Sequence, residues 1–104
     1  MIEINVTQPP FANYDWSRMK NMYTDLVLGE VGALLETGEM CDCTECVLDV
    51  VAIALNSLPP AYWVSGQYNA FTSPATFLSD ARNCDRAKEA VKRAVRLVQR
   101  NPHH

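Results

Sequence analysis

The segment CDCTECVLDVVAIALNSLPPAY, residues 41–62, decides the fold of this 104-residue chain. Its centre, VLDVVAIAL, is apolar on nearly every side apart from Asp49, and a helix of this kind is buried on most of its faces. The apolar run is shorter than the ~20 residues that cross a bilayer, so its surroundings must be protein. One neighbouring helix cannot easily surround it, which indicates an intertwined homodimer.

The flanking residues set the limits of this central helix. Asp42 or Thr44 can cap a helix over residues 45–57, and Pro59-Pro60 stops it. The AYWV segment that follows, residues 61–64, is expected to form a short strand or an extended connector. The sequence therefore predicts a mainly α domain with a short extended segment after its central buried helix.

Two further helices are expected around this centre. Apolar residues recur at the 3-4-7 spacing between residues 19 and 34, which predicts a first helix over residues 15–36 that ends at Gly38. Gly29 and Gly32 lie inside it and each costs about 1 kcal/mol relative to alanine. Close approach of another helix would explain them.

A last helix is expected to start at Ser73-Pro74 and either to break near Asn83 or to continue to about Arg100. The domain then spans residues 15–101, with an arm at 1–14 and a tail at 102–104. The tail holds His103 and His104, which resemble the remnant of a purification tag and are set aside here.

The four cysteines are candidate metal ligands. Cys41, Cys43 and Cys46 supply three thiolates from one turn that enters a helix, and Cys84 is a candidate fourth ligand. Four thiolates in a tetrahedron form a structural zinc site. A redox pair at Cys43 and Cys46, disulfides, and inert buried thiols are the alternatives. The fourth thiolate comes either from the same chain or from a partner chain.

The cellular compartment affects which of these roles is expected for the cysteines. The N-terminus, MIEINVTQPPF, has no basic stretch followed by an apolar run, so it is not expected to be a signal peptide. No apolar segment is long enough for a membrane helix, and no membrane contact is expected. A cytoplasmic location is therefore expected, and disulfides are rare in that reducing environment.

The segment from Cys41 to Tyr62 resembles the signature of the ComFB (late competence development) family. Members of that family carry a cysteine cluster that runs into a D-[IV]-x-A-x-A-L-N-x-L-P-P-x-Y pattern. The positions of this pattern are filled by Asp49, Val50, Ala52, Ala54, Leu55, Asn56, Leu58, Pro59, Pro60 and Tyr62. The first helix agrees more loosely, through Asn21-Met22, Leu26-Val27 and Glu30-Val31.

The resemblance implies a small helical protein with cysteine-bound zinc that assembles as a homodimer. It also implies a regulatory role, because family members act in natural competence and are receptors for cyclic dinucleotides, chiefly cyclic di-GMP. The family's ligand-binding residues cannot be carried over position by position. The matching pattern weakens after Val64, so any ligand-binding residues have to be sought in the chemistry of residues 65–104.

Charge is distributed unevenly along the chain. Residues 1–81 hold two basic against ten acidic residues, a balance of −8, whereas residues 82–104 hold seven basic against two acidic residues, a balance of +5. In one helix over residues 80–100, five side chains would share an outer face at ~100° per residue, namely Arg82, Arg86, Arg93, Arg96 and Arg100. Cys84 would fall on the opposite, inward side.

Guanidinium groups pair with phosphate and with the guanine O6/N7 edge, so this face is a candidate site for a cyclic dinucleotide. Arg82 and Asp85 also fit the R-x-x-D pattern of inhibitory cyclic di-GMP sites. The candidate ligand-binding residues are Arg82, Asp85, Arg86, Arg93 and Tyr62. The same arginines fit an ordinary solvated helix face, and Tyr62 fits a core position.

Two functions remain open on the sequence. One is a zinc-containing homodimeric receptor for cyclic di-GMP or a related cyclic dinucleotide, which acts on an unidentified protein partner. The alternative is a structural zinc module that binds only protein. No enzymatic activity is expected, because no nucleophile has a histidine base within the domain. Duplex nucleic acid is not an expected partner, since the net charge is −3 and no recognition motif is present.

Overall fold

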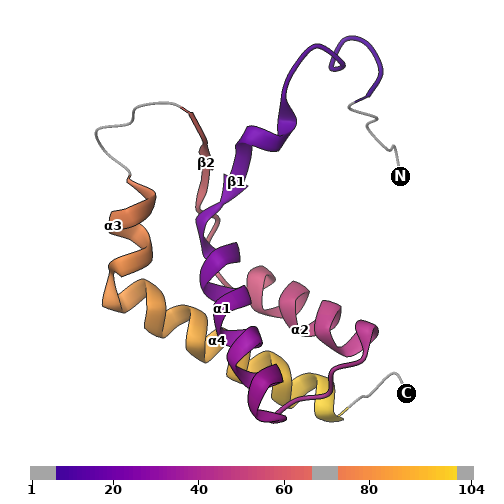
Figure 1. Ribbon diagram of the computed structural model, residues 1–104, viewed down its shortest axis with the longest axis vertical. Helices are drawn as coiled ribbons and strands as arrows, with labels where there is room; N and C mark the ends of the chain where they lie inside the picture. Colours follow the sequence, from indigo (N-terminus) through magenta and orange to yellow (C-terminus); the bar gives the residue numbers. More distant parts are fainter. Residues whose placement is uncertain (1–6, 67–72, 101–104) are drawn as a thin grey trace.

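The structure of the chain is a computed structural model that describes residues 7–66 and 73–100. Within these residues it contains four α-helices and one two-stranded sheet, in the order β1, α1, α2, β2, α3, α4 (Figure 1). The prediction of a mainly α fold is therefore confirmed. Residues 1–6 of the expected arm and the expected tail at 102–104 lie outside the described residues.

Helix α1, Met22–Thr37, begins later than the sequence predicted. The residues before it form a 3-10 turn at Trp16–Arg18 and strand β1 at Met19–Asn21. The Asn21 side chain then caps the helix by accepting a hydrogen bond from the backbone N–H of Tyr23 at 3.0 Å. Gly38 ends the helix as predicted, at a left-handed φ of 72°.

Strand β2, Tyr62–Val64, confirms the extended segment expected after the central helix. It pairs antiparallel with β1, with Lys20 opposite Trp63 at the centre of the register. The periodicity that predicted a longer first helix missed this pairing, because the partner strand lies more than forty residues away in the sequence.

Helix α2, Thr44–Asn56, matches the predicted central helix to within one residue at each end. Its buried residues are Cys46, Val50 and Ala54, which recur every four residues and form one stripe. On another side of the helix, 59% of Leu48 is exposed. Val47, Val51, Ile53 and Leu55 are partly buried beside the stripe, so a single chain covers most of α2 and leaves the side that carries Leu48 open.

The C-terminal region forms two helices, α3 at Pro74–Ser79 and α4 at Ala81–Arg100. The break lies at Asp80 rather than near Asn83. Asp80 has an extended ψ of 120°, and its carboxylate accepts a hydrogen bond from the backbone N–H of Arg82 at 2.8 Å. This carboxylate caps α4, which then continues without interruption to Arg100.

The core lies where α4 packs against α1 and α2. Tyr23, Val27 and Val31 of α1 and the buried stripe of α2 meet the inward face of α4. That face consists of small side chains, namely Ala87, Ala90, Val91, Ala94 and Val98. The start of α2 lies beside the end of α4, because Cys46 and Val98 line the same cavity. The two helices therefore run in opposite directions.

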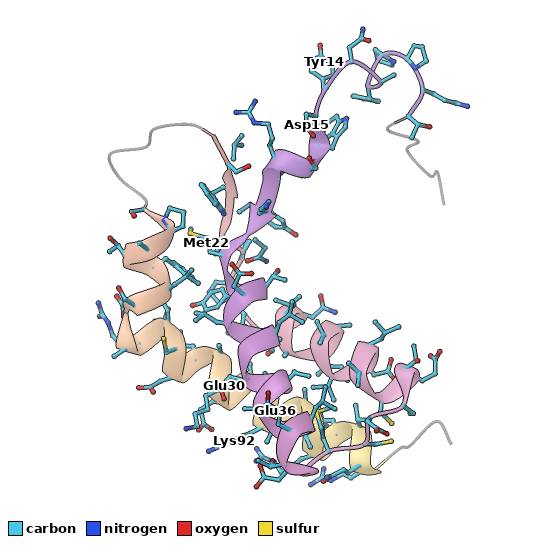
Figure 2. The ribbon with its side chains drawn as sticks, viewed as in Figure 1. Tyr14, Asp15, Met22, Glu30, Glu36 and Lys92 are labelled. Atoms are coloured by element: carbon cyan, nitrogen blue, oxygen red, sulfur yellow. The ribbon has the colours of Figure 1, made fainter. Side chains whose placement is uncertain are left out.

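The chain is more extended than a compact domain of its length. Its radius of gyration is 16.0 Å, whereas about 13 Å is expected for a compact chain of this size. The segment before α1 projects away from the helices, and Figure 2 shows Tyr14 and Asp15 far from Glu36. The exposed fractions of Tyr14 and Trp16 in this segment are 66% and 39%.

The two glycines inside α1 face open space. A Cβ atom added at Gly29 or Gly32 would meet nothing within 4 Å. The close helix approach that the sequence suggested at these positions is therefore not made within the described part of the chain.

The packing of α2 on α4 predicts a difference between two chemically identical substitutions. Val50 is 1% exposed in the core, whereas Val64 on β2 is 39% exposed. We expect Val50→Ala to lower the free energy of unfolding by about 2 kcal/mol, because it removes buried methyl groups and leaves a cavity. Val64→Ala should cost well under 1 kcal/mol.

Urea unfolding, at one protein concentration and one metal concentration, measures both changes. Equal losses in the two variants would contradict the placement of Val50 in the core.

Candidate functional site

Three cysteines meet in the turn between α1 and α2. The Sγ atoms of Cys41, Cys43 and Cys46 all lie within 4.8 Å of one another. Cys41 is exposed, Cys43 is half-buried and Cys46 is buried. The chain reaches this arrangement because Met40 turns into the core immediately before the cluster, while Cys46 already belongs to the buried stripe of α2.

Cys43 is the N-cap of α2, in place of the Asp42 or Thr44 that the sequence suggested. Its Sγ atom accepts a hydrogen bond from the backbone N–H of Cys46 at 3.4 Å. A thiolate is favoured at this position, because the unpaired N–H groups and the dipole at a helix start stabilise negative charge. The sequence favoured thiolates at the start of this helix but did not identify the capping sulfur.

Hydrogen bonds within the cluster shift the pKa values of two of the thiols in opposite directions. The backbone N–H of Cys46 is the main group that lowers the pKa of the Cys43 thiol, followed by the thiols of Cys46 and Cys41. The pKa of Cys46 is raised to about 12, chiefly by its hydrogen bond with Cys43 and then by its burial. Cys43 is therefore the more readily ionised thiol of this pair, and Cys46 is the thiol that holds its proton more tightly.

This donor set fits a thiophilic divalent metal ion. Soft thiolates that converge within one turn are the ligands preferred by zinc and by other metals of similar softness. A bound cation would replace the shared protons and neutralise the thiolates together. The three cysteines can therefore hold a metal ion, and they account for three of its ligands.

The structure does not bring Cys84 to this cluster. Cys84 lies in the first turn of α4, where its thiol donates a hydrogen bond to the carbonyl of Leu78 at 3.3 Å. The cluster lies beside the opposite end of α4, where Cys41 and Val98 line one cavity. Fourteen residues of helix separate Cys84 from Val98, a distance of about 21 Å along the axis.

A second candidate site lies on the outward side of α4. Arg86, Arg93 and Arg96 line a groove of about 470 Å³, whose other wall is the segment Ser57, Leu58 and Pro59 after α2. We call this the arginine groove. Glu89 and Ala90 complete its lining. The sequence predicted that these arginines share a face, but not that the end of α2 lies beside them.

The arginines of the groove form no ion pair with acidic side chains of the described residues. Glu89, the acidic residue of its lining, lies 3.9 Å from Lys92. The guanidinium groups of Arg86, Arg93 and Arg96 form no ion pair within the described residues. The groove therefore combines a concave shape with an excess of positive charge, which favours an anionic ligand.

The other predicted ligand-binding residues lie outside this groove. Arg82 is paired with Asp80 at 3.9 Å, and Asp85 is an exposed residue near the start of α4. Tyr62 is 62% exposed and lines a different cavity of about 640 Å³ with Trp63 and the start of α1. Of the predicted ligand-binding residues, Arg86 and Arg93 line the arginine groove, whereas Arg82, Asp85 and Tyr62 do not.

None of the helices in the described residues is both long enough and apolar enough to cross a membrane.

The sequence was also compared with known proteins. Residues 20–102 match the family described as late competence development protein ComFB. Neither the curated proteins nor the solved structures yielded a match. The matched residues cover most of the chain, including all four cysteines and the arginine groove. This chain belongs to the ComFB family of late competence development proteins.

Proposed function

We propose that this protein is a non-enzymatic receptor for a cyclic dinucleotide, chiefly cyclic di-GMP, with a structural zinc ion and a homodimeric assembly. Membership of the ComFB family suggests a competence-related regulatory role. The observation that supports the ligand most directly is the arginine groove, in which three guanidinium groups that pair with no acidic side chain in residues 7–66 and 73–100 border one concavity.

The chemistry of the arginine groove suits a cyclic dinucleotide. Such a ligand carries two phosphodiester charges and two bases, and guanidinium groups pair with phosphate and stack on bases. Arg86 and Arg93 are seven residues apart on one helix, about 10 Å along its axis, so they can meet separate parts of one ligand. The groove volume of about 470 Å³ falls within the range of small-molecule sites.

The alternative is a zinc module that binds only protein, and the exposed apolar side chains favour it. This alternative predicts that the arginine face is already paired with acidic residues. Arg82 fits that description through Asp80, whereas the arginines of the groove do not. A second copy of the chain could cover the exposed apolar residues equally well. These residues therefore do not decide between the two functions, and we propose the receptor because the arginines of the groove lack acidic partners among the described residues.

We propose zinc as the metal of the cysteine cluster, because closed thiolate-rich sites of this kind are typical of structural zinc. The ion would connect the turn that holds Cys41 to the start of α2 at Cys46. Reduced thiols are needed for this role, which fits action in the cytoplasm. A closed thiolate site would leave no open coordination position for catalysis at the metal, which agrees with a non-enzymatic role.

We propose that a second copy covers the open faces of α1 and α2. Leu28 on α1 is 49% exposed, and Leu48 on α2 is 59% exposed. Gly29 and Gly32 leave space beside α1 into which another helix can pack. The extended shape of the single chain agrees with a partner that supplies the missing packing.

The ligand proposal is tested by calorimetry with cyclic di-GMP on the zinc-loaded protein. We expect binding that Arg86→Ala and Arg93→Ala each weaken about 10- to 100-fold, since each removes a charged hydrogen bond worth about 1.5–3 kcal/mol. Lys88→Ala is the matched control, because Lys88 is an exposed cation of α4 outside the groove. No binding at tens of micromolar by the wild-type protein would rule out the receptor.

The metal proposal is tested by elemental analysis of protein purified without chelator. We expect about one zinc ion per chain, a content that Cys43→Ser and Cys46→Ser reduce severely because each removes a thiolate. Glu45→Gln is the control, since Glu45 is an exposed neighbour in the same turn that carries no thiol. Wild-type protein that holds no zinc, with four titratable thiols, would contradict the proposal.

The dimer proposal is tested by sedimentation equilibrium. We expect a mass of twice the 11.7 kDa of one chain, and we expect Leu48→Lys to raise the dissociation constant of the dimer at least about tenfold. The reason is that lysine would place a charge in an apolar interface. Leu97→Lys makes the same change at a 40% exposed position of α4 and should leave the dimer intact.

Equal weakening of the dimer by these two substitutions would place the interface elsewhere. A wild-type protein that is monomeric at tens of micromolar would exclude the homodimer.

A further inference from the structure

We infer that the segment before β1 inserts its aromatic side chains into a cavity of a second copy of the chain, and that the second copy does the same in return. We call residues 11–18 the aromatic arm. The cavity, of about 640 Å³, is lined by both strands and by residues of α1, α2 and α3, and we call it the ribbon pocket. The inference rests on the proposed homodimer and names two surfaces that meet in it.

The rings of the aromatic arm pack on one another. The ring of Trp16 lies 5.7 Å from that of Phe11 and 6.4 Å from that of Tyr14 between centroids, edge to face in both pairs. The indole N–H of Trp16 also donates a hydrogen bond to the carbonyl of Phe11 at 3.1 Å. None of the three residues belongs to the hydrophobic core of the described chain. A cluster of exposed aromatic side chains of this kind marks a contact surface.

The aromatic arm is held away from the ribbon pocket of its own chain. The backbone N–H of Ser65 donates to the carbonyl of Arg18 at 2.8 Å, and Nε of Arg18 donates to the carbonyl of Ser65 at 2.9 Å. These bonds fasten the base of the arm to the end of β2. Figure 2 shows Tyr14 and Asp15 far from Met22, which lines the ribbon pocket. The arm and the helices around the pocket therefore lie toward opposite ends of the ribbon.

The lining of the ribbon pocket suits an aromatic occupant. Its apolar part includes Met19, Met22, Leu55, Tyr62 and Trp63. Aromatic rings pair favourably with one another, and methionine sulfur makes favourable contacts with ring edges. The pocket can therefore accept the kind of side chain that the arm presents.

One face of the ribbon between β1 and β2 is also open. Met19 lies opposite Val64 in the register, and Asn21 lies opposite Tyr62, so these four side chains share one face. The exposed fractions of Met19, Tyr62 and Val64 are 52%, 62% and 39%. An isolated two-stranded ribbon is only marginally stable in water, so cover on this apolar face would stabilise it.

A two-fold contact through this face brings both features together. In such a contact the same surfaces meet in both directions. Two ribbons that lie face to face, with their arms pointing in opposite directions, place the arm of each chain over the pocket of the other. The contact is continuous with the side of α2 proposed for the dimer, because Ala52 lines the pocket and lies one helical turn from Leu48.

The charges of these surfaces are compatible with a second copy of the chain. The arm carries Asp15 and Arg18, and the pocket is lined by Lys20 and Asp25, so each surface holds one charge of each sign. Two copies that met through the outward arginines of α4 would instead bring like charges together. The ribbon side of the molecule is therefore the better surface for self-association.

The first test is sedimentation equilibrium of the full-length, zinc-loaded protein. We expect Trp16→Ala to raise the dissociation constant of the dimer at least about thirtyfold, because enclosed tryptophan side chains dominate many interfaces and this one would be lost twice per dimer. Trp16 lies outside the core, so the variant should keep its helices, which circular dichroism checks. Asn13→Ala is the control, since Asn13 is an exposed polar residue of the same arm, and it should leave the dimer intact.

The second test identifies the residues that the arm contacts. The photoreactive amino acid benzoylphenylalanine replaces Tyr14, and chains labelled with a heavy isotope are mixed with unlabelled chains before irradiation. We expect mass spectrometry to find adducts between a labelled and an unlabelled chain at the residues of the pocket, within 19–25, 52–56 and 62–63. The same replacement at Leu97, a 40% exposed position of α4, should give no adduct at these residues.

An unchanged dissociation constant in Trp16→Ala would overturn the inference while the homodimer stands. Adducts confined to single chains, or adducts between chains at residues outside the pocket, would overturn it as well. A wild-type protein that is monomeric at tens of micromolar would overturn the homodimer and the inference together, and calorimetry with cyclic di-GMP would still decide the ligand proposal.

Discussion

The packing of α4 against α2 is the contact on which the rest of the structure depends. The inward face of α4 carries Ala87, Ala90 and Ala94, and these small side chains let the axes of neighbouring helices approach closely. The stripe of Cys46, Val50 and Ala54 on α2 meets this face. Because the two helices run in opposite directions, the cysteine turn is set against the end of α4, and the segment after α2 is set beside its outward arginines.

The sequence predicted the parts of this arrangement that depend on local pattern. The limits of α2 follow from a continuous apolar run and two prolines, and the arginines share a face because helical phase is periodic. A local pattern does not predict the position along one helix axis at which another helix packs. Phase can turn Cys84 inward, but it cannot show that α2 begins beside the opposite end of α4, which separates Cys84 from the other three cysteines.

Interactions that a local pattern does not reveal explain the other differences between the predicted and the observed helices and strands. Strand β1 takes residues that carry helical periodicity, because Met19–Asn21 finds its hydrogen-bonding partner in Tyr62–Val64. Helix α4 starts at Ala81 because the Asp80 carboxylate caps it, so the chain neither breaks near Asn83 nor forms one continuous helix from Pro74. The arginine groove needs Ser57 and Pro59 as its second wall, and no pattern in either segment alone indicates that they meet.

The two candidate sites share one rigid element. Cys43 caps the start of helix α2, and the residues that follow its end line the arginine groove. The two sites therefore lie at opposite ends of this helix. A metal ion at the cluster would fix the turn that holds Cys41 to the start of α2, whereas side-chain packing alone holds α2 against α4. Because Ser57 and Pro59 follow α2 directly, the packing of α2 on α4 also places them opposite Arg86 and Arg93 in the arginine groove. One helix-helix contact therefore positions both candidate sites.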